Sequence, residues 1–143
     1  MQRAGADETL LYNTDWANHV VRWSKGSLGV DATFDSVGTT LMDSFLATKT
    51  KGNVVFYGMS GGNPPLIDPR MLMDTSKTLT GGDLWNHVTT HHDRIKRSEA
   101  LFEEMRQGRL RIEDPKRYSL KDGAEAHRFL ESRLSTGKIL LIP

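Results

Sequence analysis

The chain has 143 residues, no cysteine and a formal net charge of +1, with 37% hydrophobic and 26% charged residues. This length suits one domain with a buried core. The small net charge gives no electrostatic reason to expect nucleic acid as a partner, and a chain without cysteine has no disulfide, thiolate nucleophile or cysteine-bound zinc. No stretch has the roughly 20 apolar residues of a membrane helix, and the polar N-terminus is not a signal peptide. We therefore expect a soluble, cytoplasmic protein without membrane contact.

The N-terminal third alternates between strand-like and helix-like patterns. Residues 9–12 are a short apolar run that predicts a strand. Asp15 can cap a following helix, in which Trp16, Val20 and Trp23 share one face. The next apolar run begins after two glycines and completes a strand–helix–strand pattern.

The middle of the chain repeats the same alternation. We expect a strand at residues 30–35, rich in β-branched and aromatic residues, and a helix at about 39–49. Residues 54–57 form an uninterrupted apolar strand, typical of a parallel sheet that is buried on both faces. A short helix at 69–73 and a strand around Leu79 follow. This order predicts an α/β fold with a parallel sheet.

The last third differs in pattern from the rest. An amphipathic helix is expected at residues 91–107, closed by Gly108. Strand-like segments follow at 110–112 and around Tyr118. Ser119 and Asp122 resemble a capping box for a helix to about Leu134. We expect the apolar segment 137–142 to be a buried strand.

Short sequence matches occur in a fixed order along almost the whole chain. They lie at residues 5–7, Tyr12, 29–31, 35–38, Gly58, 60–61, 118–120, 126–127, 130–133 and 137–143. Their order and spacing resemble the C-terminal part of the zinc-independent quinone oxidoreductases, the zeta-crystallin-like branch of the medium-chain dehydrogenases/reductases.

This resemblance implies an NADPH-dependent oxidoreductase that reduces quinones or related enones and whose complete chain is about twice as long. It implies that residues 1–108 are a partial dinucleotide-binding (Rossmann) domain and that residues 109–143 are a helix/strand segment of the catalytic lobe. No Gly-x-Gly-x-x-Gly turn, which would receive the pyrophosphate, occurs in the sequence. Without the central strands, either the strand at 9–12 pairs directly with the strand at 30–35 or an edge of the sheet stays open.

The resemblance also places the NADP(H) contacts. Tyr12 and Arg133 fall near the 2′-phosphate of the cofactor, and they alone favour NADPH over NADH. For Tyr12 simple packing on a helix is an equal alternative, and Arg133 is equally explained by the dipole of its helix. The other contacts are in two loops that follow strands and would flank the nicotinamide. They are Asp35, Ser36, Val37 and Gly38, and Tyr57, Gly58, Ser60 and Gly61.

Within these loops Ser36 has two interpretations, a hydrogen bond to the cofactor or a cap on the next helix. Gly58, Gly61 and Gly62 suggest a functional loop, because an exposed loop has no packing reason for three glycines. No residue is identified as catalytic. His87, His91 and His92 are close in sequence, but they have no third ligand nearby, so no metal site is predicted.

Two hypotheses about the chain remain open, and a third, an enoyl- or enone-type reductase of the same superfamily, differs from the first only in substrate. The chain is part of an oxidoreductase whose N-terminal half is supplied by another chain or was removed, or it is a non-catalytic remnant with weak or no nucleotide binding. In either case the family suggests a homodimer through the strand at residues 78–84. The substrate cannot be identified, because the resemblance assigns the other wall of the pocket to the N-terminal half.

Overall fold

The computed structural model describes residues 5–12, 14–132 and 134–143. Its contacts divide the chain into two compact units, Met1–Arg94 and Ile95–Pro143, which are described separately. No helix among the described residues is long and apolar enough to cross a membrane.

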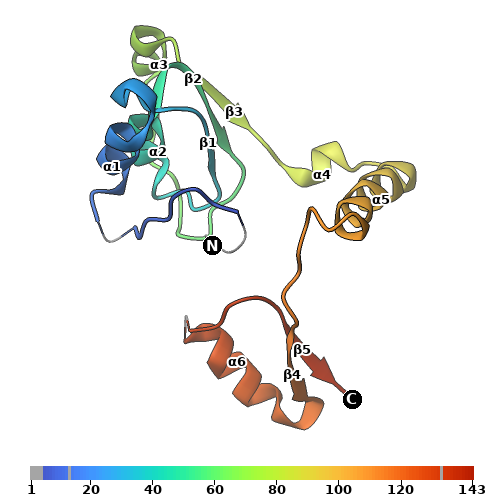
Figure 1. The fold of residues 1–143 in the computed structure, drawn as a ribbon. Helices are drawn as coiled ribbons and strands as arrows, with labels where there is room; N and C mark the ends of the chain where they lie inside the picture. The colour runs from blue at the N-terminus through green and yellow to red at the C-terminus, as the bar shows by residue number, and fades with distance from the viewer. Residues whose placement is uncertain (1–4, 13, 133) are drawn as a thin grey trace. The chain divides into compact units, whose positions relative to one another are not determined.

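The first unit is a three-stranded parallel sheet with helices, as predicted from the strand and helix alternation. Its strands pair in the order β1-β2-β3 (Figure 1). The elements are α1 (Trp16–Trp23), the short 3-10 helix η2 (Lys25–Ser27), β1 (Val30–Asp35), α2 (Leu41–Ala47), β2 (Thr48–Phe56), α3 (Pro69–Thr75), β3 (Thr78–Gly81) and α4 (Leu84–His87).

The core of this unit lies between α2 and the central strand. Leu41 and Phe45 of α2 and Val54 of β2 are buried together. Partly buried apolar residues surround them, namely Phe56, Ile67, Met71, Leu72 and Leu79. The parallel sheet is therefore covered by α2 and α3 on the face that carries Val54.

The boundary between α2 and β2 differs from the prediction. The helix expected to reach residue 49 ends at Ala47, and Thr48 begins β2 opposite Val30. The register then shifts to Ala32 opposite Asn53, and Lys51 within the irregular stretch has a φ of +64°. Pairing of this β-branched segment with β1 therefore overrides helix continuation.

Two predictions at the N-terminus are wrong. Residues 9–12 form no strand, because β2 is the only described strand that pairs with β1, so the edge of β1 next to α1 stays open. The Asp15 side chain does not cap α1. Its Oδ1 instead accepts a hydrogen bond of 2.8 Å from Nδ2 of Asn18, which removes the acceptor from the helix end.

The second unit contains a two-stranded parallel sheet and one covering helix. The elements are most of α5 (His91–Arg106), then β4 (Lys116–Ser119), the 3-10 helix η3 (Leu120–Asp122), α6 (Gly123–Glu131) and β5 (Ile139–Ile142). β4 pairs with β5 from Lys116 opposite Ile139 to Ser119 opposite Ile142. Nζ of Lys116 lies 3.8 Å from the ring centre of Phe129 on α6, a cation–π contact between sheet and helix.

Several sequence expectations for this unit need correction. Residues 110–112 form no strand, and α6 ends at Glu131 rather than near Leu134. The strand expected to be buried is β5, but its Leu140 and Leu141 are 41% and 39% exposed. A sheet of two strands with one helix has too few neighbours to bury a whole apolar strand.

The capping box around Ser119 is only half present. Ser119 Oγ accepts a long hydrogen bond of 3.4 Å from the backbone N–H of Lys121, at the start of η3. Asp122 makes no side-chain hydrogen bond as the cap of α6. The 3-10 helix η3 separates Ser119 from α6, which Asp122 directly precedes.

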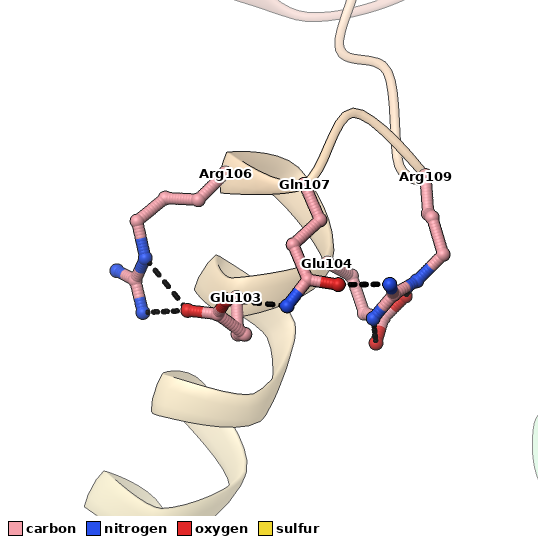
Figure 2. A network of polar contacts seen from close by, with 5 residues as sticks. All are labelled: Glu103, Glu104, Arg106, Gln107 and Arg109. Carbon is pink, nitrogen blue, oxygen red and sulfur yellow. Dashed lines mark hydrogen bonds and ion pairs between the residues drawn. The ribbon is translucent and has the colours of Figure 1, made fainter.

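The C-terminal end of α5 carries an exposed network of charged and amide side chains (Figure 2). Glu103 accepts hydrogen bonds from Arg106 and Gln107, and Glu104 accepts from Arg109, which also contacts Gln107. These bonds lower the pKa of Glu103, through Gln107 first and Arg106 second, and the pKa of Glu104 through Arg109. Gly108, with a φ of +70°, ends the helix as predicted.

Candidate functional site

The loops after β1 and β2 lie together at the carboxyl ends of the parallel strands. The backbone N–H of Tyr57 donates to the carbonyl of Asp35 at 2.9 Å, which extends the strand pairing into the loops. Beyond it, the carbonyl of Ser36 accepts from both the N–H and the hydroxyl of Ser60, each at 3.1 Å. The N–H of Gly61 donates to the carbonyl of Val37 at 2.9 Å. The two loops that the sequence singled out therefore form one structure.

Glycines let these loops approach each other closely. Gly38 has a φ of +87°, and a Cβ atom there would lie 2.3 Å from the carbonyl oxygen of Gly62. A Cβ at Gly58 would lie 2.9 Å from the carbonyl oxygen of Ser36, and one at Gly61 would lie 2.7 Å from the Val37 side chain. The close approach of the two loops is thus a packing reason for these glycines, contrary to the expectation from the sequence.

Asp35 supplies the hydrogen bonds that order the first loop. Its Oδ1 accepts from the backbone N–H groups of Val37 and Gly38, both at 2.9 Å. Its Oδ2 accepts from the hydroxyls of Thr40 at 2.9 Å and Ser44 at 2.7 Å. The carboxylate therefore joins the loop at residues 36–38 to α2 through the hydroxyls of Thr40 and Ser44, while no described side chain caps the first residues of α2, Ser36 included.

The environment of Asp35 favours its charged form. Burial raises the pKa of this carboxyl, but the hydrogen bonds from Gly38, Ser44, Val37 and Thr40 together outweigh burial, and the net pKa is lowered. The residue is only 3% exposed. An anion is thus already held beside the start of α2 by the hydroxyls of Thr40 and Ser44.

A groove of about 470 Å³ lies beside the second loop. It is lined by Phe56, Tyr57, Gly58, Met59, Gly81, Gly82, Asp83 and Asn86. Sequence reasoning identified Tyr57 and Gly58 but missed the residues that follow β3. The N–H of Gly82 donates to the carbonyl of Phe56 at 2.9 Å, and the carboxylate of Asp83 accepts from the N–H of Trp85 at 3.0 Å.

The pair Gly81-Gly82 was the available signal for these missed residues. It directly follows the strand predicted around Leu79, in the same parallel sheet. Loops at the carboxyl ends of neighbouring parallel strands converge, so the third loop belongs with the first two.

Of the two residues predicted near a 2′-phosphate, Tyr12 is among the described residues. Tyr12 is 66% exposed, and its ring centre lies 5.6 Å from that of Trp16 in α1. This contact is the packing alternative considered for Tyr12. Arg133 lies outside the described residues, so its predicted role remains a prediction.

No group of three or more His, Asp or Glu side chains in the described part of the chain is arranged to hold a metal ion. His87 ends α4, whereas His91 and His92 begin α5.

An open parallel sheet with glycine loops at the carboxyl ends of its strands is the architecture of the nucleotide-binding α/β proteins. Comparison with known proteins specifies the class further. The family model described as zinc-binding dehydrogenase matches residues 4–141, and the chain belongs to this family. The donor set that a zinc ion would need does not occur among the residues that the structure describes.

The relatives are reductases of the kind that the sequence matches indicated. The chain is 30% identical to a 2-haloacrylate reductase of a Burkholderia species over 148 residues, covering 99% of this chain and 44% of the relative. It is 31% identical to a probable quinone oxidoreductase of Schizosaccharomyces pombe, covering 96% and 42%. The chain thus spans less than half the length of the curated relatives that it matches.

Solved structures give the same result for the fold. A quinone oxidoreductase of Pseudomonas syringae pv. tomato superposes with a TM-score of 0.85 at 27% identity, covering 99% of this chain and 44% of that one. The Escherichia coli quinone oxidoreductase complexed with NADPH gives 0.84 at 29% identity, covering 99% and 45%. The predicted resemblance to the C-terminal part of quinone oxidoreductases, and the predicted Rossmann-like fold, are confirmed.

Proposed function

We propose that this chain is the nicotinamide-side part of an NADPH-dependent oxidoreductase of the quinone reductase type, which transfers a hydride to a quinone or enone. The observation that carries the proposal is the joined pair of loops at the carboxyl ends of β1 and β2, beside a groove that includes Tyr57 and Gly58. The similarity to a quinone oxidoreductase complexed with NADPH supports it.

The residues of this chain would hold and orient the cofactor. Bound NADPH would supply the hydride from its nicotinamide. Gly58 and Gly82 add no side chain to the groove, and the half-exposed Tyr57 offers a ring against which a flat ligand can pack. Ser36, Val37, Gly38, Ser60 and Gly61 form the backbone of the joined loops that would carry the ring side of the cofactor.

The charged end of the cofactor would need donors from outside this chain. The sequence contains no Gly-x-Gly-x-x-Gly turn, and the hydroxyls of Thr40 and Ser44 at the start of α2 already bind the carboxylate of Asp35. Backbone N–H groups at such a turn normally bind the pyrophosphate. We therefore propose that catalysis requires a further polypeptide segment, in the same protein or in a partner chain, that also forms the other wall of the substrate pocket.

A non-catalytic remnant is the second candidate, and one contact favours it. Tyr12 packs on Trp16 and does not line the groove. If this arrangement persists with ligand present, the chain has no described residue at the 2′-phosphate and would bind NADPH weakly or not at all.

The assembly we propose is a homodimer through the outer edge of β3. In the described part of the chain β3 pairs only with β2, so its other edge can accept a second strand. The strand is shorter than the predicted 78–84, because it ends at Gly81 and α4 begins at Leu84. A strictly monomeric mass by light scattering would remove this proposal.

Two further predictions complete the proposal. We place residues 1–108 in the dinucleotide-binding domain and residues 109–143 in the catalytic lobe, on the family pattern alone. A cytoplasmic location is supported by the absence of cysteine, which fits a reducing compartment.

The decisive experiment is a titration of NADPH into the full chain, followed by nucleotide fluorescence, with a quinone reduction assay on the same sample. Micromolar binding with turnover would contradict the remnant hypothesis, and no detectable binding would contradict autonomous catalysis. The Tyr57→Ala variant should weaken binding if the groove holds the cofactor. Tyr12→Phe is its control, because it changes the ratio of NADPH to NADH affinity only if the phenol contacts the 2′-phosphate.

A further inference from the structure

The Asp35 carboxylate has no remaining capacity to bind a ligand directly. An ionised carboxylate offers about four lone-pair sites, and Asp35 uses two on Oδ1 for backbone N–H groups and two on Oδ2 for hydroxyls. Its side chain is buried at the end of β1. A cofactor hydroxyl or amide could reach this carboxylate only by displacing one of its four internal donors.

The same four bonds determine the conformation of the loop that follows. The bonds from Val37 and Gly38 fold residues 36–38 back over the end of β1, and those from Thr40 and Ser44 fix this turn to α2. This conformation directs the carbonyls of Ser36 and Val37 towards the second loop.

The second loop depends on the first for its hydrogen bonds. Ser60 donates to the carbonyl of Ser36 through both its N–H and its hydroxyl, and Gly61 donates to the carbonyl of Val37. The backbone carbonyl of Gly62 lies close to Gly38, which leaves no room for a side chain at Gly38. A change at Asp35 would therefore be transmitted to residues 58–62, of which Gly58 and Met59 line the groove.

We propose that Asp35 is a positioning residue, whose carboxylate holds the loop after β1 and, through that loop, fixes the loop after β2 for the nicotinamide side of the cofactor. The role in cofactor binding rests on the function proposed above. Asp35 itself makes no contact with the cofactor. The predicted site residue thus acts through Ser36, Val37 and Gly38.

The test compares two aspartates of the same strand. Asp31 is also in β1, but its side chain is 89% exposed and pairs with Lys49, so Asp31→Asn is the matched control for Asp35→Asn. Amide hydrogen exchange of Ser60 and Gly61 measures the order of the second loop, and the amides of β2 report global opening. The measurement needs no cofactor.

Asp35→Ala should lower the protection of the Ser60 and Gly61 amides by about tenfold, the effect of losing one hydrogen bond to a charged group, and should leave β2 protected. Asp35→Asn should stay within about threefold of the natural chain, because an amide oxygen still accepts both N–H groups and the hydroxyls can accept from its NH₂. Asp31→Asn should leave the protection of both amides unchanged.

Unchanged protection of Ser60 and Gly61 in Asp35→Ala would overturn the positioning role, as would an equal loss in the loop and in β2. If Asp35→Ala does not fold, Ser44→Ala replaces it. This variant removes one donor, and it should lower loop protection more than Asp31→Asn does, with the opposite order contradicting the proposal.

An NADPH titration of the same variants distinguishes the role of Asp35 in ordering the loops from the proposed binding of NADPH. A natural chain that binds no NADPH contradicts the proposed function, whereas the exchange data still decide whether Asp35 holds the loops. If the natural chain binds NADPH, Asp35→Ala should weaken this binding. Restored NADPH binding in Asp35→Asn would support a positioning role, because the amide has nearly the shape of the carboxylate. Equal binding by Asp35→Ala and the natural chain would overturn the role in the cofactor site.

Discussion

The two units of the chain have similar secondary structure but very different interiors. In the first unit α2 and α3 cover a three-stranded sheet, and Leu41, Phe45 and Val54 form a buried core. Among the described residues of the second unit, Ala126 is the one buried apolar residue, and the strand β5 stays half-exposed. The first unit therefore has the packing that can hold functional loops in place, whereas the second relies on local bonds.

This difference suggests where stability and function are coupled. The joined loops follow directly from β1 and from its partner β2, which contributes Val54 and Phe56 to the core. The polar network of the second unit is on the exposed end of α5, where solvent screens it (Figure 2). Changes in the first unit should thus affect both folding and cofactor binding, and changes in the second should be local.

The largest effect is expected from Phe45→Ala. Phe45 is 3% exposed in the core, and truncation of a buried phenylalanine costs about 3–5 kcal/mol of unfolding free energy. Urea denaturation followed by tryptophan fluorescence measures it, because Trp16, Trp23 and Trp85 all lie in the first unit. The control is Phe129→Ala in α6 of the second unit. A fluorescence transition that moves as far in the control would contradict the separation of the two units.

The next effect is expected from Gly38→Ala. An alanine there combines a left-handed backbone with a Cβ atom 2.3 Å from a carbonyl oxygen, so the cost should exceed the roughly 1–2 kcal/mol of the backbone conformation alone. Gly108→Ala is the matched control in the second unit, with a φ of +70° and no atom within 4 Å of the added Cβ. It should cost about 1 kcal/mol. Equal losses in thermal melts would show that the approach of the two loops is not tight.

These two glycines also show what sequence can predict. The end of α5 at Gly108 was predictable, because the conformation of a helix terminus depends on neighbouring residues. The contact of Gly38 with Gly62 joins segments that are distant in sequence. Sequence patterns identified both loops as parts of a site, but they could not show that the glycines serve the fit between them.

The same distinction explains the failures at the sheet edges. Residues 9–12 have the composition of a strand, but a strand requires a neighbour to pair with, and none of the described strands lies beside them. Thr48 fits a helical face by its spacing, yet it belongs to β2 and pairs with Val30 of β1. Both errors come from tertiary pairing, which local propensity does not contain.

Acid should affect the two regions differently. The pKa of Asp35 is lowered on folding, so its contribution to stability is present above the usual carboxyl pKa of about 4 and is lost as the pH falls through the lower pKa of the folded state. The difference in unfolding free energy between the natural chain and Asp35→Asn should therefore shrink as the pH is lowered from about 7 to about 3. A difference that does not depend on pH would show that the charge of Asp35 contributes nothing.

Salt should change the stability contribution of the acidic residues of α5 but not that of Asp35. Glu103 and Glu104 also have lowered pKa values, from Gln107, Arg106 and Arg109, but they are exposed. At about 1 M salt, where the Debye length is about 3 Å, their contribution should disappear. The pH dependence that Asp35→Asn removes should persist, because its four donors are direct hydrogen bonds in a buried site. Loss of both effects in high salt would contradict this distinction.

The smallest effect is expected from Arg109→Ala, although Arg109 makes three hydrogen bonds in the network at the end of α5 (Figure 2). Exposed ion pairs contribute little, because ordering long side chains offsets their attraction. The backbone already closes this helix, since the N–H of Gly108 donates to Met105 and the N–H of Arg109 donates to Glu104, both at 3.0 Å. Thermal melts by far-ultraviolet circular dichroism should show no measurable change for Arg109→Ala and a clear loss for Gly108→Ala. The reverse order would mean that side-chain charge, and not the left-handed glycine, determines where α5 ends.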